Sequence, residues 1–284
     1  MTDLGKSNLQ IFMSGLGRSK LLRSIYSRLS PRLQPVLREM NALVSGHPPP
    51  TFQGWMMTTQ HQIPWIDRWE TFLEAADELN SFEMKAPASY DRKELDGLLW
   101  RHWNVAYSVK HSVAKTGRPH FTGVECGVGE GVTAHIAASQ IRSEQLESAS
   151  LHLYDAWSTI DTDQLLKSEI SRISTYEQLS MQRTRKNLLK HSDMLFWHPG
   201  KIPESFSAKA PEAINWLHID LNSAVATEEA LSFFWPRLLE NGVIIFDDYG
   251  WSHFEDTRKT VAGFLSDKPG VLLPLPTGQA LYFR

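Results

Sequence analysis

The 284-residue sequence has only one cysteine, Cys126. It therefore cannot form an internal disulfide, and it cannot build a zinc site from several thiolates. It also has no run of roughly 20 apolar residues and no apolar leader segment, so we expect neither a membrane span nor export. The formal net charge of -3 leaves no basic excess for nucleic acid, and no local basic patch stands out. These absences favour a soluble cytoplasmic protein without nucleic-acid or membrane contacts.

Two parts of the chain differ in pattern. Apolar residues recur at helical spacing over 21–44, and prolines at 48–50 then interrupt the chain. We expect an N-terminal helical extension or lid over residues 1–90 and a catalytic domain over residues 91–284. After a further helical stretch at 92–114, short apolar runs alternate with amphipathic stretches, which indicates a parallel sheet with crossover helices. The strands are predicted near 121–125, 151–154, 194–197, 215–219 and 243–246.

The end of the chain has a different pattern. Apolar runs at 271–274 and 279–283 are separated by Pro276, Thr277 and Gly278, which is typical of a β-hairpin. We therefore predict an α/β fold with a doubly wound, mostly parallel, Rossmann-like sheet that ends in an antiparallel hairpin. This ending is typical of class I methyltransferases and less so of nicotinamide dehydrogenases.

A glycine-rich turn follows the first predicted strand and precedes a helix predicted over 132–141. Its sequence is Glu125-Cys126-Gly127-Val128-Gly129-Glu130-Gly131. Glycines let the backbone approach a ligand closely, and the helix N-terminus offers free N–H groups. The last glycine comes one residue earlier than in the nicotinamide fingerprint, so the spacing favours S-adenosylmethionine (SAM). The carboxylate of Glu125 suits the ammonium group of a methionine moiety.

The second predicted strand ends in Tyr154-Asp155-Ala156-Trp157. An acid at this place can accept the ribose hydroxyls of an adenosine, and we assign this role to Asp155. The indole of Trp157 is placed to stack on adenine or on a sugar ring. The predicted cofactor-binding residues are therefore Glu125, Gly127, Val128, Gly129, Gly131, Asp155, Ala156 and Trp157.

Two later strands also end in acids, Asp220 and the pair Asp247-Asp248. The carboxyl ends of parallel strands meet at one edge of a sheet, so the three carboxylates are expected to converge. A hard cation such as magnesium suits such oxygen ligands. The alternative is that Asp247 and Asp248 cap the loop and helix that follow. His218 and His253 are candidates for a general base, and His253 is the favoured one.

These blocks, together with His218-Ile219-Asp220, 233–242 and 246–250, resemble the macrocin O-methyltransferase family. The likeness extends over roughly residues 95–264, and the spacing from Asp220 to Asp247-Asp248 is its most specific part. It implies a magnesium-dependent SAM enzyme that methylates a sugar hydroxyl, with these three acids as metal ligands and Asp220 or a nearby histidine as proton acceptor. Where the family has glycine, a second acid and an aromatic residue after the first acid, this chain has Leu221-Asn222-Ser223-Ala224.

The leading hypothesis is thus a SAM-dependent O-methyltransferase that acts on a sugar or a glycosylated metabolite. A nicotinamide-dependent oxidoreductase and a non-catalytic binding module with the same fold are the alternatives. The sequence leaves the oligomeric state open, a homo-oligomer included. Cys126, Trp197, Trp216 and Trp235 are expected to be core residues, and the basic run Arg183, Arg185 and Lys186 is expected to be a solvated helix face.

Overall fold

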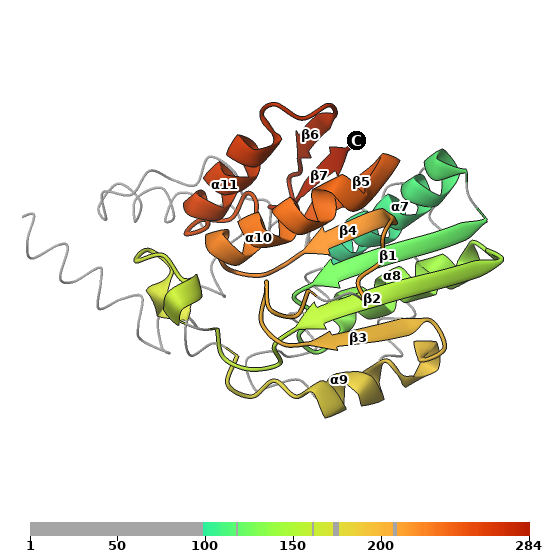
Figure 1. Ribbon diagram of the computed structural model, residues 1–284, viewed down its shortest axis with the longest axis horizontal. Helices are drawn as coiled ribbons and strands as arrows, with labels where there is room; N and C mark the ends of the chain where they lie inside the picture. Colours follow the sequence, from blue (N-terminus) through green and yellow to red (C-terminus); the bar gives the residue numbers. More distant parts are fainter. Residues whose placement is uncertain (1–98, 118, 161, 173–175, 207–208) are drawn as a thin grey trace, which may run out of the picture. The chain divides into compact units, whose positions relative to one another are not determined.

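The computed structural model describes residues 99–284 apart from 118, 161, 173–175 and 207–208. The extension predicted over residues 1–90 lies outside the described residues. Seven strands of the described part form one sheet (Figure 1). Their bounds are β1 His120–Cys126, β2 Ser148–Asp155, β3 Leu195–Pro199, β4 Ile214–Ile219, β5 Leu238–Phe246, β6 Val271–Pro274 and β7 Ala280–Phe283.

The strand order across the sheet is β3-β2-β1-β4-β5-β7-β6. The first five strands of the chain run parallel, because each returns to the sheet through a crossover connection. β7 pairs antiparallel with β5, and β6 pairs antiparallel with β7. The predicted parallel sheet with a terminal hairpin is thereby confirmed, and the carboxyl ends of β1, β2, β4 and β5 lie at one edge.

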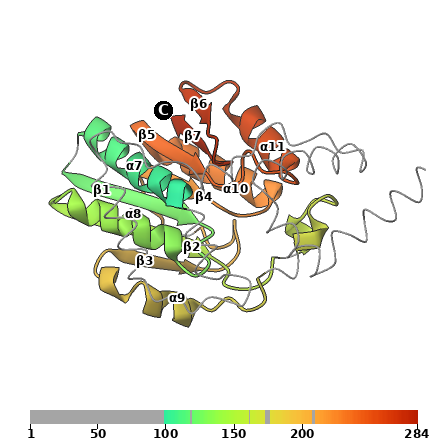
Figure 2. The ribbon, with the colours of Figure 1, turned by 180° about the vertical axis from the view of Figure 1, so that it is seen from behind.

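Helices cover both faces of the sheet. α7 Leu99–Thr116 and α8 Val132–Ser143 lie over one face, and α10 Ala224–Phe234 and α11 Glu255–Leu265 lie over the other (Figure 2). The short helix α9 Met181–Asn187 lies beside the edge strand β3. Short 3-10 helices complete the described elements: η1 Thr162–Gln164, η2 Ile170–Arg172, η3 Leu189–His191 and η4 Trp235–Arg237.

The core consists of two apolar layers, one on each face of the sheet. β4 is buried along its whole length, as a central parallel strand covered on both faces must be. Trp216 is fully buried and its indole N–H donates to Ser108 Oγ at 2.8 Å, whereas Trp197 and Trp235 are half-buried. Cys126 is a buried free thiol, as predicted. In the described part of the chain, the helices are too short or too polar to cross a membrane.

Candidate active site

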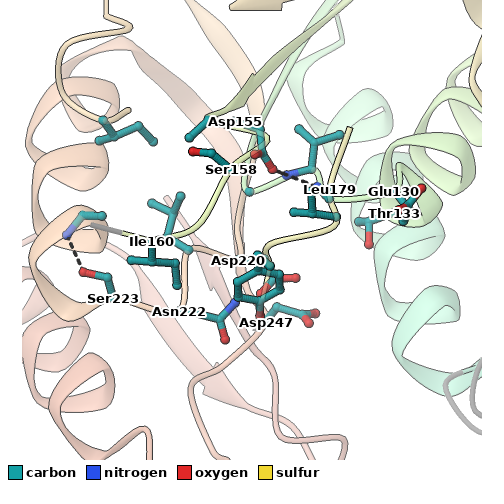
Figure 3. Close-up of a pocket in the computed structure, with 18 of the residues that line it drawn as sticks. Glu130, Thr133, Asp155, Ser158, Ile160, Leu179, Asp220, Asn222, Ser223 and Asp247 are labelled. Carbon is teal, nitrogen blue, oxygen red and sulfur yellow. Dashed lines mark hydrogen bonds between the residues drawn. The ribbon is translucent and has the colours of Figure 1, made fainter. Parts of the chain in front are cut away.

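A cavity of about 410 Å³ lies at the carboxyl edge of the parallel strands. Its wall combines the turn between β1 and α8, the ends of β2, β4 and β5, and the start of α7. Figure 3 shows Asp155 on one side of this cavity and Asp220 and Asp247 on another. The strand order therefore brings most of the predicted donor residues and the three predicted metal ligands to a single site.

The glycines of the β1–α8 turn are required by geometry. Gly127, Gly129 and Gly131 all have positive φ angles, of 89°, 54° and 91°. A Cβ on Gly127 would lie 1.9 Å from the carbonyl oxygen of Asp220, because the turn passes directly against the end of β4. A Cβ on Gly129 would meet nothing within 4 Å. Gly129 thus leaves open the space into which a cofactor can approach the backbone.

Asp155 organises the glycine turn as well as lining the cavity. Its Oδ2 accepts hydrogen bonds from the amides of Val128 at 2.7 Å and Gly129 at 2.8 Å. Its Oδ1 accepts from the amide of Trp157 at 2.5 Å. Burial raises the pKa of the Asp155 carboxyl, although these three bonds oppose the shift. A carboxylate has about four acceptor positions, so roughly one remains for a ribose hydroxyl instead of the two that the sequence suggested.

The structure does not bring the indole of Trp157 into the cavity wall. Trp157 is buried with a φ of 47°, and its indole N–H donates to the carbonyl of Gly129 at 3.2 Å and to Thr184 Oγ1 at 3.0 Å. The hydroxyl of Thr184 donates to the same Gly129 carbonyl at 2.7 Å. The side chain of Trp157 therefore supports the glycine turn from behind, where the sequence suggested stacking on adenine. Ala156 does line the cavity.

An ion pair joins helix α9 to the β1–α8 turn. Arg183 Nε lies 2.9 Å from both carboxylate oxygens of Glu130, which is 8% exposed. The side-chain amide of Asn187 donates to the carbonyl of Glu130 at 3.0 Å. The expectation of a solvated basic face is thus wrong for Arg183, whose partner belongs to the glycine-rich turn. Bidentate pairs of this kind fix geometry as well as charge.

Three ionisable groups, Glu125, His218 and Asp247, form a row across the ends of β1, β4 and β5, and the first two are buried. Glu125 Oε1 lies 3.6 Å from His218 Nδ1, and His218 Nε2 lies 3.6 Å from Asp247 Oδ1. Burial lowers the pKa of His218, but the two carboxylates outweigh this effect and raise the pKa to about 10. Glu125 is fully buried and does not line the cavity. It faces His218, so the structure does not place it directly against a methionine ammonium.

The three acids of the predicted metal site do converge. Among the described residues, Asp220, Asp247 and Asp248 form the group whose ligand oxygens lie within 4.8 Å of one another. Burial, followed by the charges of Asp247 and Asp248, raises the pKa of Asp220 well above its usual range. Burial also acts to raise the pKa of Asp247, but Arg101, His218 and Gln279 outweigh it and hold that pKa below its usual range. The cluster thus contains one carboxyl that favours a proton and one that stays ionised.

His253 lies away from this cluster. It is exposed, has a φ of 72° and does not line the cavity, so the structure does not bring the predicted base to the acids. Of the described residues in the cavity wall, His102 is the sole histidine. Burial lowers the pKa of His102 to about 4, which makes it a neutral imidazole near pH 7.

Several wall residues carried no sequence signal. Arg101 and His102 lie on α7, and Tyr176, Gln178 and Leu179 precede α9. None belongs to a motif, and only the folded chain brings them to the cavity. Asn222 had a usable signal, since asparagine tolerates the left-handed conformation that its φ of 55° shows. The next residue, Ser223, is the N-cap of α10, where its hydroxyl accepts from the amide of Ala226 at 3.1 Å.

The strand order and the glycine turn, with Asp155 after the next strand, define the class I methyltransferase fold. A family model described as a methyltransferase domain matches residues 124–249, which include the turn, Asp155 and the three acids. Residues 124–249 therefore form a methyltransferase domain with the class I fold. The curated proteins contain no significant match to this sequence.

Solved structures show the same fold. The O-methyltransferase NovP superimposes with a TM-score of 0.64 at 15% identity, covering 75% of this chain and 99% of NovP. The calicheamicin methyltransferase CalS11 superimposes with a TM-score of 0.53 at 14% identity, covering 79% of this chain and 95% of CalS11. At these identities the similarity establishes the fold alone.

Proposed function

We propose that the protein transfers a methyl group from SAM to a hydroxyl group of a sugar or glycosylated small molecule, assisted by a magnesium ion. One observation carries the proposal. The glycine-rich turn with Asp155 and the acids Asp220, Asp247 and Asp248 line the same cavity. A methyl donor and a cation-bound acceptor can therefore meet there, and proximity of this kind supplies much of the rate in a transfer reaction.

The donor side of the cavity fits SAM. Gly129 leaves open space where a side chain would stand, and the carboxylate of Asp155 retains acceptor capacity toward the cavity. Asp155 also holds the amides of Val128 and Gly129, so the turn is ordered before the cofactor arrives. Such preorganisation reduces the conformational entropy lost on binding. The glycine spacing and the methyltransferase family match both argue against the nicotinamide alternative.

The acid side fits a hard divalent cation. Three carboxylates whose oxygens lie within 4.8 Å of one another repel each other, and this repulsion adds to burial in raising the pKa of Asp220. A cation bound between them would relieve the repulsion. Asp220, Asp247 and Asp248 would hold the ion. When bound, magnesium supplies a positive charge that lowers the pKa of an acceptor hydroxyl.

The proton of the hydroxyl must leave as the methyl group arrives. The acceptor oxygen forms a bond to the methyl carbon while the carbon–sulfur bond breaks, so a methyl ether, S-adenosylhomocysteine and a proton result. Asp220 is the proposed proton acceptor, because it lines the cavity at the edge where the acceptor hydroxyl would meet the donor. The low pKa of His102 makes it a poorer base in the same wall.

The acceptor class rests on the resemblance to the macrocin O-methyltransferases and agrees with two structural neighbours. NovP is described as an O-methyltransferase, and CalS11 as a calicheamicin methyltransferase. The cavity volume of about 410 Å³ lies within the range of small-molecule sites. A cytoplasmic location, a homo-oligomeric state and the extent of the catalytic domain over 91–284 stay predictions.

Calorimetry and a methyl-transfer assay test the proposal together. We expect S-adenosylhomocysteine to bind with or without magnesium, and transfer to glycosylated acceptors to fall when a chelator is added. Asp248→Asn should keep cofactor binding and lose metal-dependent transfer. Asp193→Asn is the matched control, because Asp193 is an exposed carboxylate that pairs with Arg142 and does not line the cavity. Equal turnover in chelator and in magnesium would refute the metal-assisted step.

A further inference from the structure

A positively charged side chain, that of Arg101, contacts the acid cluster. Arg101, on α7, forms an ion pair through Nη2 with Oδ2 of Asp247. The same nitrogen donates to the backbone carbonyl of Asp247 at 2.9 Å, and the guanidinium lies 5.1 Å from the ring centroid of Trp251. The side chain is 13% exposed, so these contacts hold it at the cavity wall. Arg101 lies outside residues 124–249, which match the methyltransferase domain.

Both oxygens of Asp247 therefore have partners. Oδ2 faces Arg101, while Oδ1 accepts from Gln279 Nε2 at 2.7 Å and lies 3.6 Å from His218 Nε2. A magnesium ion needs a carboxylate oxygen at about 2.0–2.1 Å. An ion at Oδ2 would lie within a few ångströms of the guanidinium, where two cations repel strongly because little water screens them.

We propose that Arg101 is a built-in counter-ion that competes with the divalent cation for Asp247. This inference rests on the proposed metal-assisted function and deepens it. In the metal-free protein Arg101 neutralises the carboxylate, and metal binding requires the guanidinium to give up Oδ2. Arg101 thus weakens metal binding to the acid cluster.

A purely structural role makes a different prediction. Gln279 also accepts from Asn104 Nδ2 at 2.9 Å, so a polar network joins α7 to the loop before β7. If Arg101 served only to hold α7 in place, its removal would lower thermal stability and would leave metal affinity unchanged or weaker. Competition predicts tighter metal binding, which a loosened structure does not produce.

The test is calorimetric titration of magnesium, and separately manganese, into protein saturated with S-adenosylhomocysteine. Arg101→Met removes the charge and keeps most of the side-chain volume, and Arg101→Gln is a second neutral variant. Arg101→Lys retains the charge. We expect the neutral variants to bind metal about tenfold more tightly or better, as the loss of a nearby like charge implies. Arg101→Lys and the surface control Arg142→Met should bind as the unmodified protein does.

The outcomes separate the two proposals. Equal or weaker metal binding by both neutral variants would overturn the competition and leave the metal-assisted reaction intact. Metal binding by the neutral variants alone would support the competition and contradict metal dependence of the natural chain. No binding by any variant would overturn both.

A measurement on the natural chain avoids any folding defect of the variants. Displacement of Arg101 moves a cation away from the indole of Trp251. Saturation with magnesium should therefore change the tryptophan fluorescence, and the change should be absent in Trp251→Phe. An identical change in the two proteins, or none in either, would overturn the displacement.

Discussion

Alanine at two glycines of the same turn should separate the effect on stability from the effect on cofactor binding. Gly127 and Gly129 both have positive φ angles, so alanine at either position costs roughly 1–2 kcal/mol. Only Gly127 faces an obstacle, since its Cβ would lie 1.9 Å from the Asp220 carbonyl oxygen, while ordinary contact begins at 3.4 Å. Moving that strand end aside adds about 1–3 kcal/mol, as overpacking does in a dense interior.

Gly127→Ala should therefore lower the free energy of unfolding by about 2–5 kcal/mol, and Gly129→Ala by about 1–2 kcal/mol. At about 2–4 °C per kcal/mol for a domain of this size, the melting temperature should fall by roughly 4–20 °C and 2–8 °C respectively. The effect on cofactor affinity has the opposite order: among folded molecules, Gly129→Ala should lose more affinity than Gly127→Ala. The Cβ of Gly129→Ala enters the open space at the donor side, so this variant should lose affinity for S-adenosylhomocysteine with a small change in stability.

Thermal denaturation followed by circular dichroism and calorimetry with S-adenosylhomocysteine measure the two effects on the same samples. Each variant serves as the control for the other, because the residue type and the sign of φ are shared. Equal melting temperatures for the two variants would refute the close approach of the turn to β4. Full cofactor affinity in Gly129→Ala would refute the placement of the donor against this glycine.

Three further perturbations test the supports of the site. Asp155→Asn should weaken cofactor binding by tenfold or more, since a charged acceptor of three amide bonds contributes about 1.5–3 kcal/mol per bond; calorimetry measures it. Arg183→Met should raise KM for SAM and leave KM for the acceptor unchanged, whereas Arg185→Met should alter neither. The pKa of His218 is raised from 6.5 to about 10 in the folded state, so its contribution to stability is complete below 6.5 and is lost as pH rises toward 10. Urea denaturation should show that the free energy of unfolding falls less over this pH range in His218→Gln than in the unmodified protein.

The periodicity of the sequence was sufficient to predict the sheet, because buried parallel strands and a terminal hairpin produce strong local patterns in the sequence. β4 reads as an apolar run that is buried on both faces, and the turn after Pro274 carries the residues that a hairpin requires. The strand ends then place Asp155, Asp220 and Asp247 at one edge without further information. The convergence of these acids follows from topology alone.

The direction in which a side chain points could not be predicted in the same way. Trp157 follows Asp155, the predicted ribose-binding acid, by two positions, yet its positive φ turns the indole toward Gly129 and Thr184. His253 follows the acid pair, yet the turn that separates them leaves it exposed. In both cases a single backbone angle decides the side of the loop on which the side chain lies. Residue type does not reveal that angle for tryptophan, and for histidine it gives only a modest enrichment of positive φ.

The electrostatics of the acid cluster depend on residues outside the sequence motif of three acids by which the cluster was predicted. Asp247 is flanked by Arg101 from α7, by His218 from β4 and by Gln279 from the loop before β7. Two of these partners are cationic, so the charge available to a metal is smaller than the count of carboxylates implies. A motif of three acids therefore specifies where a cation can bind, whereas its neighbours decide how tightly. The proposed competition predicts that relatives lacking an arginine at the position of Arg101 bind a divalent cation more strongly at the same three acids.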